Sequence, residues 1–425
     1  MTYRRSGASA ALHNAVILVK HLVLIGDGMA DHPLDELGGR TPIEAAATPA
    51  MDRLVMQGLT GQYCPIPEGM PPGSDIGNLS LFGYDPCATF SGRAPIEAAN
   101  QGITLAADEV AFRCNLVTLA DGQMRDFTSG HITTEEARAI IATLNETLAQ
   151  QFPVAFNTGV SYRHLAVLSN SAAASDDALV ATQCTPPHDI TGQAYPGYLP
   201  SGEASPLLRS IMDRSQEVLA DHPVNRNRIA RGLSPATSIW LWGQGRAPKM
   251  ARYAELYGKT GAVVSAVDLV KGIGVCAGLQ VLNVPGATGW LDTDYAGKVS
   301  AALGALETLD VAFIHVEAPD ETAHQGRIDL KMQAIADFDN HVVAPCLEWA
   351  GRRRDTRVLV APDHFTLIST KTHAGGPCPF ALCGPGVPVG EQSAYSEGIA
   401  ATSGILIRDG HRLVRAFLGD AALAL

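Results

Sequence analysis

The sequence of 425 residues lacks an apolar run long enough to cross a bilayer as a helix, which takes about 20 residues. The longest apolar stretch near the start, Val16 to Ile25, is interrupted by Lys20 and His21. The residues ahead of it (MTYRRSGASAALHN) include two arginines but no full apolar segment and cleavage site of a secretory signal. We therefore expect a short disordered lead, no membrane partner and a cytoplasmic protein.

Charge and paired cysteines are also scarce. Charged residues make up 17% of the chain and hydrophobic residues 46%, which excludes an intrinsically disordered protein. The net charge of −12 argues against nucleic acid as a partner, because nucleic-acid binders usually present a basic patch. The eight cysteines include no Cys-x-x-Cys pair, which favours free thiols over a disulfide framework or a zinc ribbon.

Two regions of the chain show alternating strand and helix patterns, in residues 1–88 and 250–425. Such alternation predicts an α/β fold, with a mostly parallel sheet between layers of helices. Residues 89–249 differ, because helical stretches there are separated by loops rich in Gly, Pro and Asn and by short strand candidates such as Tyr162 to Leu168. We expect this region to form an inserted α+β domain.

Residues that commonly ligate metals follow three predicted strands. Asp27 follows the strand at 19–25, Asp320 follows 311–316, and Asp363 with His364 follows 358–361. Because ligands in open α/β sheets collect at the C-terminal ends of strands, we expect these side chains to converge.

The spacing suggests how these residues divide between two metals. Asp320 and His324 are four residues apart and share one face of a helical turn, and with His373 they form a reasonable ligand set for a borderline divalent ion. A second site would use Asp27, Asp363 and His364. Two metals about 4 Å apart are typical of phosphoryl transfer, where they hold the attacking and leaving oxygens.

Ser74 is the candidate nucleophile. Prolines and a glycine precede it, and Ser74-Asp75 is followed by Leu79 and Phe82 at helical spacing, so a helix is expected to begin there. A helix N-terminus stabilises a phosphate that the hydroxyl acquires. Each motif alone has an ordinary explanation: a surface Asp–His pair, a helix cap or a turn. Their joint order along the chain favours the metal-dependent interpretation.

The same motifs give the chain a resemblance to a known family. It resembles the archaeal-type, cofactor-independent phosphoglycerate mutases of the alkaline phosphatase superfamily, from about residue 20 to residue 387. The matching segments, in order, are GDGMAD, TPIEAAATPAMDRL, PGSDIGNLSLFGYDP, GRAPIEAA, VAFRCNLVT, VEAPDETAHQGR and APDH…THAGGPCPF.

The resemblance implies a fold, a reaction and a set of site residues. A phosphatase-like domain would be interrupted by a lid domain, and a small phosphorylated metabolite would exchange its phosphoryl group between the 3- and 2-oxygens of glycerate through a phosphoserine on Ser74. Two divalent ions would take part, manganese being the first expectation, with zinc, cobalt and magnesium as alternatives. One would be held by Asp320, His324 and His373, and the other would be surrounded by Asp27, Ser74, Asp363 and His364.

An anionic substrate needs cationic or hydrogen-bonding partners. Arg228 and Arg231 in HPVNRNRIARG, Lys271 in AVDLVKGIG and His131 in RDFTSGHI are the candidates. A solvated helix face is the alternative role for the arginines, and a loop or capping role the alternative for His131.

Two segments depart from the archaeal pattern. The chain has residues 125–131 (RDFTSGH) where those mutases have a DRRAGR-type segment, and Trp242 where they tend to have an arginine. These segments resemble instead a bacterial branch in which some members are proposed homoserine kinases. Homoserine kinase, or another metal-dependent phosphotransferase, is thus the alternative function. A non-catalytic descendant that binds a metabolite or partner is a third hypothesis. Because the chain has no Gly-x-x-x-x-Gly-Lys-Ser/Thr loop, any use of ATP would depend on Ser74 and the metals.

Overall fold

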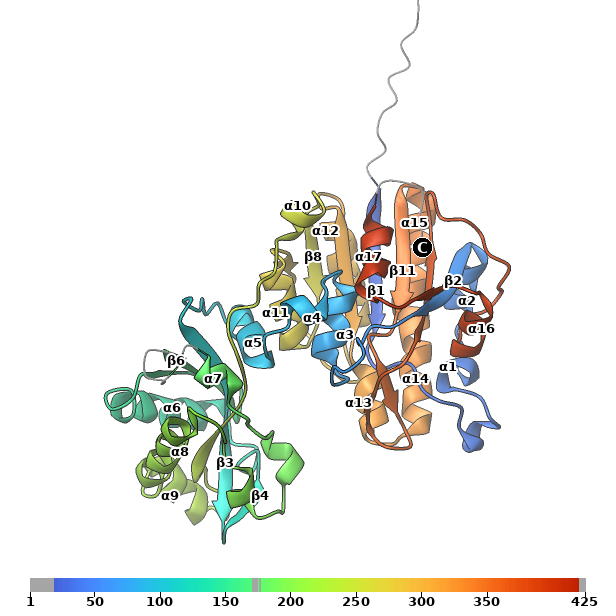
Figure 1. Cartoon of the computed structure of the whole chain (residues 1–425). Coiled ribbons are helices and arrows are strands. Elements are labelled where there is room, and N and C mark those ends of the chain that lie inside the picture. Colours follow the sequence, from blue (N-terminus) through green and yellow to red (C-terminus); the bar gives the residue numbers. More distant parts are fainter. Residues whose placement is uncertain (1–18, 170–174, 176, 420–425) are drawn as a thin grey trace, which may run out of the picture.

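The computed structural model describes residues 19–169, 175 and 177–419. The disordered lead expected before residue 15 lies outside them. Figure 1 shows two bodies side by side, a larger one that contains β1, β8 and β11 and a smaller one that contains β3 and β6. Among the described residues, no helix has the length and apolar character needed to cross a membrane. All eight cysteines are free.

The larger body is built on an eight-stranded sheet. Neighbouring strands run parallel except at the two pairs made by β14, so the mostly parallel sheet predicted from the sequence is confirmed. In spatial order the strands are β15 (Leu406–Ile407), β2 (Gly58–Tyr63), β14 (Cys378–Cys383), β11 (Thr356–Ala361), β1 (Lys20–Gly26), β10 (Val311–Val316), β8 (Gly261–Val264) and β9 (Gln280–Val281).

Helices cover both faces of this sheet because its central strands are apolar on both sides. Along β1, Leu22 and Leu24 point to one hydrophobic core, whereas Val23 and Ile25 point to the other. The first core is closed by α1 (Pro42–Ala45), α2 (Pro49–Met56), α12 (Tyr295–Ala305), α14 (Ile328–Phe338) and α15 (Ala344–Arg353), and the second by α3 (Ser74–Leu81), α11 (Asp268–Cys276) and α17 (His411–Leu418).

Local sequence signals explain where the first helices begin. Thr41 caps α1 by accepting a hydrogen bond from the Glu44 backbone N–H. The Glu44 carboxylate in turn accepts one from the Thr41 backbone N–H, which completes a capping box. Pro49 occupies the first position of α2, where a missing N–H costs nothing. The start of α3 at Ser74 agrees with the prediction from the sequence.

The smaller body has a five-stranded sheet of its own. Its helices α6 (Thr134–Thr147) and α8 (Ser205–Leu219) share a hydrophobic core with this sheet, and α9 (Pro223–Ala230) follows α8. The strands are β4 (Gln123–Asp126), β3 (Glu109–Ala120), β6 (Arg163–Ser169) and β5 (Val154–Asn157), with β7 (Ser238–Gly245) paired to β3.

The chain enters and leaves the smaller body at one place. A Cβ on Gly92 would lie 2.1 Å from the carbonyl oxygen of Gln244, and one on Gly245 would lie 1.9 Å from that of Ser91. The two connections therefore pass backbone against backbone, an approach that only glycine permits. Next to this crossing, α5 (Arg93–Asn100) contacts α11 of the larger body and β3 and β7 of the smaller one. The boundaries at 89 and 249 stay a prediction.

An aromatic stack joins the sheet to the end of the helix that begins at Ser74. The rings of Phe82 and Phe313 are 4.2 Å apart and nearly parallel, and both are fully buried. We expect Phe313→Ala to lower the free energy of unfolding by about 3–5 kcal/mol, through lost burial and a residual cavity. Urea unfolding measures the change. Val389→Ala, at a residue that is 67% exposed, serves as the control, and an equal loss in both variants would contradict the assignment.

Candidate metal centre

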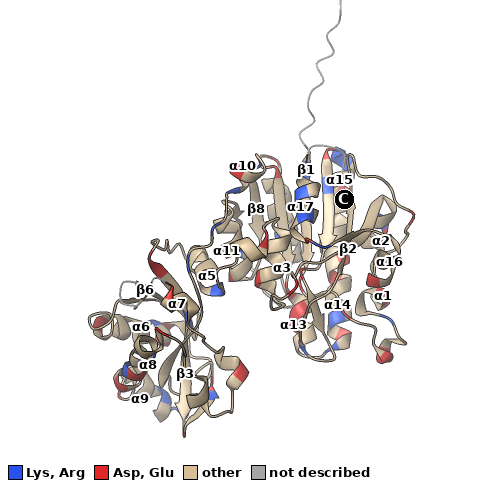
Figure 2. Cartoon of the chain, in the orientation of Figure 1, with Lys and Arg blue, Asp and Glu red and all other residues tan. Residues whose placement is uncertain are grey.

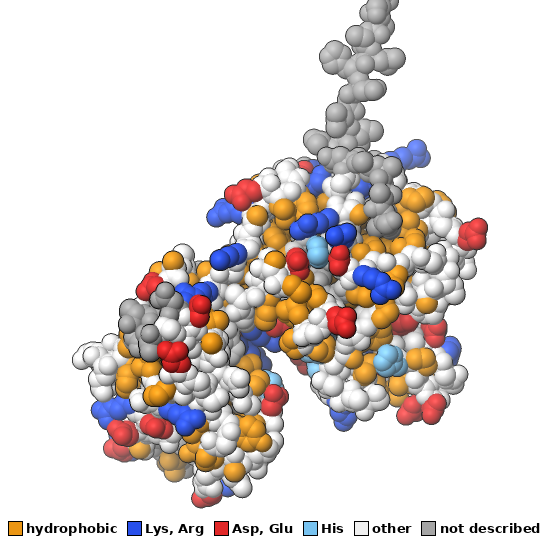
Figure 3. Space-filling view, viewed as in Figure 1, with side chains coloured by type: hydrophobic (Ala, Val, Ile, Leu, Met, Phe, Trp, Pro, Cys, Tyr) orange, Lys and Arg blue, Asp and Glu red, His pale blue; other side chains and the backbone are white. Residues whose placement is uncertain are grey.

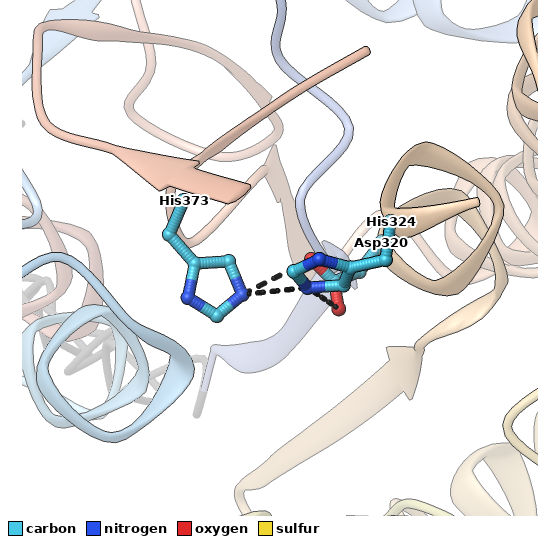
Figure 4. A group of neighbouring side chains, drawn as sticks. All are labelled: Asp320, His324 and His373. Atoms are coloured by element: carbon cyan, nitrogen blue, oxygen red, sulfur yellow. Dashed lines mark hydrogen bonds and ion pairs between the residues drawn. The ribbon is translucent and has the colours of Figure 1, made fainter. Parts of the chain in front are cut away.

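Three of the predicted ligands come together at the carboxyl end of β10. Asp320 and His324 lie one turn apart on α13 (Ala318–His324), and His373 faces them from β13 (Thr372–Ala374). Figure 4 shows the two imidazoles turned toward each other beside the carboxylate. The Nε2 atoms of His324 and His373 are 3.0 Å apart, and Asp320 Oδ2 is 3.3 Å from the Nε2 atom of His324. We call these residues group A.

The second set, group B, consists of Asp27, Asp363 and His364, and all three are buried. Asp27 follows β1, and the other two follow β11, its neighbour in the sheet. His364 Nε2 lies 3.3 Å from Asp27 Oδ1 and 3.5 Å from Asp363 Oδ2. In each group, one donor atom from each residue lies within 4.8 Å of the others.

Ser74 lies beside these groups. Its Oγ is 3.1 Å from His364 Nε2, and the ring of His364 is 4.4 Å from that of His373, centroid to centroid. Because α3 begins at Ser74, the positive end of the helix dipole is at this hydroxyl. The structure thus brings together all seven residues that were predicted as ligands or nucleophile.

Hydrogen bonds outside group A set the orientation of His324. Its Nδ1 is 2.9 Å from the carbonyl oxygen of Lys371, which can only accept, so Nδ1 holds a proton and donates it. A neutral His324 ring then presents the lone pair of Nε2 to the group, the arrangement usual for metal-ligating histidines.

Electrostatics shows that group B suits a cation. Burial raises the pKa of Asp27 well above its usual range, and the neighbouring carboxylates of Asp363, Asp320 and Glu317 raise it further. Burial also lowers the pKa of His364, so this ring offers no compensating positive charge at neutral pH. Among the described residues, Asp27 Oδ1 has no hydrogen-bond donor. A divalent ion would satisfy that oxygen and the crowded carboxylates.

Group A suits a cation as well, although its charges are arranged differently. Burial acts to raise the pKa of Asp320, but hydrogen bonds with His324 and His373 bring it well below its usual range. The bond to Asp320 in turn raises the pKa of His324 to about 9. One carboxylate with two imidazoles is a donor set typical of zinc, manganese or cobalt, so both groups fit divalent ions.

The chain matches proteins of one family over most of its length. The model of the 2,3-bisphosphoglycerate-independent phosphoglycerate mutase family matches residues 56–225. A relative from Methanosarcina acetivorans, named as such a mutase, is 53% identical over 86% of this chain and 90% of its own. A relative from Geobacter sulfurreducens, named as a probable one, is 47% identical over 94% of this chain and 100% of its own.

The chain belongs to the family of 2,3-bisphosphoglycerate-independent phosphoglycerate mutases. The family expected from the sequence motifs is confirmed. Among solved structures, the PH0037 protein from Pyrococcus horikoshii has a TM-score of 0.78 and 29% identity, covering 93% of this chain and 96% of that one. The α/β fold with its inserted body is therefore shared with a structure determined for another protein.

Arg228 and Arg231, which were predicted to bind the substrate of this phosphoglycerate mutase relative, do not lie at groups A and B. Arg228 is buried in α9 and is used within the smaller body, where it pairs with Glu136 and donates to the carbonyls of Ser129 and Ser234. Arg231 is exposed and also faces Glu136. Figure 1 places α9 at the outer end of the smaller body, away from α13. For Arg228, this arrangement favours a structural role over substrate binding.

The other two substrate candidates lie in different surroundings. His131 is exposed, in a turn of the smaller body, with φ of +48°. Lys271 is on α11 of the larger body. Burial, helped by the Lys271 charge, lowers the pKa of Lys298 to about 8, although Glu317 acts to raise it. The Lys271 ammonium lies 3.7 Å from the carboxylate of Asp268 on the same helix. Their roles toward substrate stay predictions.

The sequence did not single out a basic cluster on the smaller body. Arg93, Arg113 and Arg163 come from α5, β3 and β6, and their charges act together on His188, whose pKa is lowered mainly by burial. Arg113 stacks 4.2 Å from the ring centre of Trp242 and pairs with Glu97 at 3.0 Å. We call the three arginines the arginine cluster.

The charges of two arginines of the cluster act on acidic residues of the larger body that neighbour group A. Burial raises the pKa of Glu321 on α13, and the charge of Arg163 acts to lower it. Arg93 likewise opposes the rise in the pKa of Glu317, which burial and its acidic neighbours bring to about 8. In the ribbon of Figure 2, Lys and Arg positions (blue) lie near α5 and Asp and Glu positions (red) lie near α13. In Figure 3 a notch separates the two bodies below their junction.

Two residues of α3 hold the Ser74 helix against group B. The Asn78 amide donates to Asp363 Oδ2 at 2.6 Å and to the Ser74 carbonyl at 2.9 Å. Gly77 lies against the same strand end, since a Cβ there would be 2.2 Å from the Asp363 carbonyl oxygen. The helix can approach Asp363 only because residue 77 has no side chain.

Gly77→Ala therefore tests how closely Ser74 must approach group B. We expect the added methyl group to push α3 away from Asp363 and to weaken manganese binding at least tenfold, measured by calorimetric titration of metal-free protein. Gly304→Ala is the control, because a Cβ at this helical glycine meets nothing within 4 Å and should stabilise the fold by up to about 1 kcal/mol. Unchanged affinity in Gly77→Ala would contradict the close approach.

Proposed function

We propose that this protein interconverts 3- and 2-phosphoglycerate through a phosphoserine at Ser74, as a cytoplasmic step of glycolysis. The observation that supports this most directly is the 3.1 Å separation between Ser74 Oγ and His364 Nε2, which places a hydroxyl at a helix N-terminus beside both ligand groups. The relatives named above as phosphoglycerate mutases supply the substrate class.

Groups A and B would each hold one divalent ion, with manganese as the first expectation. When bound, such ions lower the pKa of a nearby hydroxyl and neutralise phosphoryl oxygens. Asp320, His324 and His373 would hold the first, and Asp27, Asp363 and His364 with Ser74 would surround the second. Zinc, cobalt and magnesium remain alternatives, because ligand type alone does not select among them.

Ser74 takes part in both halves of the proposed reaction. In the first half, the bond from phosphorus to the 3-oxygen of glycerate breaks as the bond to Ser74 Oγ forms, and the proton lost by Ser74 is matched by one gained at the glycerate 3-oxygen. In the second half, the bond from phosphorus to Ser74 Oγ breaks as the bond to the glycerate 2-oxygen forms, and the proton lost by the 2-hydroxyl is matched by one gained at Ser74 Oγ. The phosphoserine must be kept from water between the two halves, or the enzyme becomes a phosphatase.

The smaller body would provide that exclusion and would bind the substrate anion. We propose that residues 89–249 act as a lid and that the arginine cluster contacts the carboxylate or phosphate of the substrate. Guanidinium groups form strong paired hydrogen bonds with such anions. The influence of Arg93 and Arg163 on the pKa values of Glu317 and Glu321 supports a closure that would bring the cluster toward Ser74.

Ser74→Ala tests the nucleophile. In an enolase-coupled assay with 3-phosphoglycerate and manganese, we expect turnover by the wild type, loss of turnover after chelation, recovery on adding manganese, and at least a thousandfold lower kcat in Ser74→Ala. Ser80→Ala is the matched control, since Ser80 is buried in the same helix but donates to the Pro65 carbonyl; it should keep most of the activity. A wild type that is inactive at every loading with manganese, zinc, cobalt or magnesium would contradict the mutase proposal.

Arg163→Met tests the arginine cluster. Arg163 is exposed and stacks on Tyr162, so its loss should leave the fold intact. Losing one charged hydrogen-bonding partner, worth about 1.5–3 kcal/mol, should raise KM for 3-phosphoglycerate roughly tenfold to a hundredfold. Arg231→Met should leave KM unchanged. A raised KM in Arg231→Met together with an unchanged KM in Arg163→Met would instead favour substrate binding by the arginines predicted from the sequence.

Homoserine kinase is retained as a second candidate because of one feature of the lid. At position 242, where the archaeal pattern has an arginine, the Trp242 ring packs on Arg113 and its Nε1–H donates to Asn115 Oδ1 at 3.0 Å. Release of ADP from ATP that depends on homoserine, and that disappears in Ser74→Ala, would support this function. Its absence in manganese-loaded enzyme that is active as a mutase would exclude it.

A further inference from the structure

Thr366 lies between the two ligand groups without being a ligand candidate itself. It belongs to β12 (Phe365–Leu367), and its side chain is fully buried. Its Oγ1 is 2.6 Å from Asp320 Oδ1, in group A, and 3.1 Å from His364 Nδ1, in group B. One hydroxyl therefore contacts a residue of each group.

The directions of these two hydrogen bonds follow from the donors available. A threonine hydroxyl has one proton, and an ionised carboxylate can only accept. The Thr366 proton is therefore donated to Asp320, and the Thr366 oxygen accepts the Nδ1 proton of His364. That tautomer leaves the lone pair of His364 Nε2 directed toward Ser74, whose Oγ is 3.1 Å away. At the other end, Asp320 Oδ2 stays turned toward His324.

The backbone of Thr366 is fixed as firmly as its side chain. The buried ammonium of Lys331 donates to the Thr366 carbonyl at 2.6 Å and to Asp31 at 2.9 Å. The Thr366 N–H donates to the Ala30 carbonyl at 3.2 Å. Across the β12–β13 hairpin, Thr366 pairs in register with His373 of group A. The hydroxyl is thus held at a set position relative to both groups.

We propose that Thr366 is a positioning residue that sets the ligand geometry of both metal groups through its single hydroxyl. It orients the Asp320 carboxylate in group A and, together with the Phe365 carbonyl 3.3 Å from His364 Nδ1, fixes the ring and tautomer of His364 in group B. Partners of this kind, one hydrogen bond removed from the metal, typically account for a 10–100-fold difference in metal affinity. This inference rests on the proposed two-metal function and adds to it a physical link between the sites.

The test compares manganese binding in full-length variants, measured by calorimetric titration of metal-free protein. Thr366→Val removes the hydroxyl and keeps the shape, and we expect both sites to bind manganese 10–100-fold more weakly. Thr366→Ser keeps the hydroxyl and should stay within about threefold of the wild type. Thr60→Val is the matched control, because Thr60 is also fully buried and its hydroxyl bonds to the Phe380 carbonyl at 2.6 Å, away from both groups. Its manganese affinities should equal those of the wild type.

Several results would overturn the proposal. These are unchanged affinity at both sites in Thr366→Val, weakening at one site alone, or equal weakening in Thr60→Val. If circular dichroism shows that Thr366→Val does not fold, Thr366→Ala takes its place, and its manganese affinities are judged in the same way. A wild type that binds two manganese ions but has no mutase turnover would refute the proposed function, whereas the affinity pattern would still decide the role of Thr366.

Discussion

Repulsion among buried carboxylates is the constraint that organises the larger body of this protein. Asp27, Asp320, Asp363 and Glu317 meet at one edge of the sheet, where burial and the three neighbouring carboxylates raise the pKa of Asp27 well above its usual range. The neighbouring histidines compensate little at group B, since burial lowers the pKa of His364. Such an arrangement persists only if the surrounding fold holds it in place, or if cations neutralise it.

The parallel strands supply that fold. β1, β10 and β11 are adjacent and parallel, so their carboxyl ends deliver Asp27, α13 and Asp363 to the same edge. Both faces of these strands are apolar and covered by helices, which fixes their register. The packing of a large hydrophobic core therefore offsets the electrostatic free-energy cost of placing these carboxylates close together.

The sequence was sufficient to predict the sheet, the helix beginning at Ser74 and the two ligand groups. Each depends on local patterns: an apolar run that ends in an aspartate, a four-residue Asp–His spacing, and a serine before helical periodicity. The arginine cluster could not be found this way, because Arg93, Arg113 and Arg163 have no shared motif and meet only through the packing of α5, β3 and β6. Arg228 was selected for its charge, yet its pairing with Glu136 depends on how α6 and α9 pack. Thr366 gave no signal beyond lying two residues after a ligand.

The glycine crossing at Gly92 and Gly245 has a consequence for how such a protein diversifies. The segments that enter and leave the smaller body are in backbone contact. The smaller body is therefore attached to the larger one by two connections that lie next to each other. Segments joined in this way can be enlarged, shortened or exchanged with little effect on the host fold. Substitutions in the inserted segment, such as one at Trp242, can therefore alter its surface while the sheet edge that carries the two ligand groups keeps its geometry.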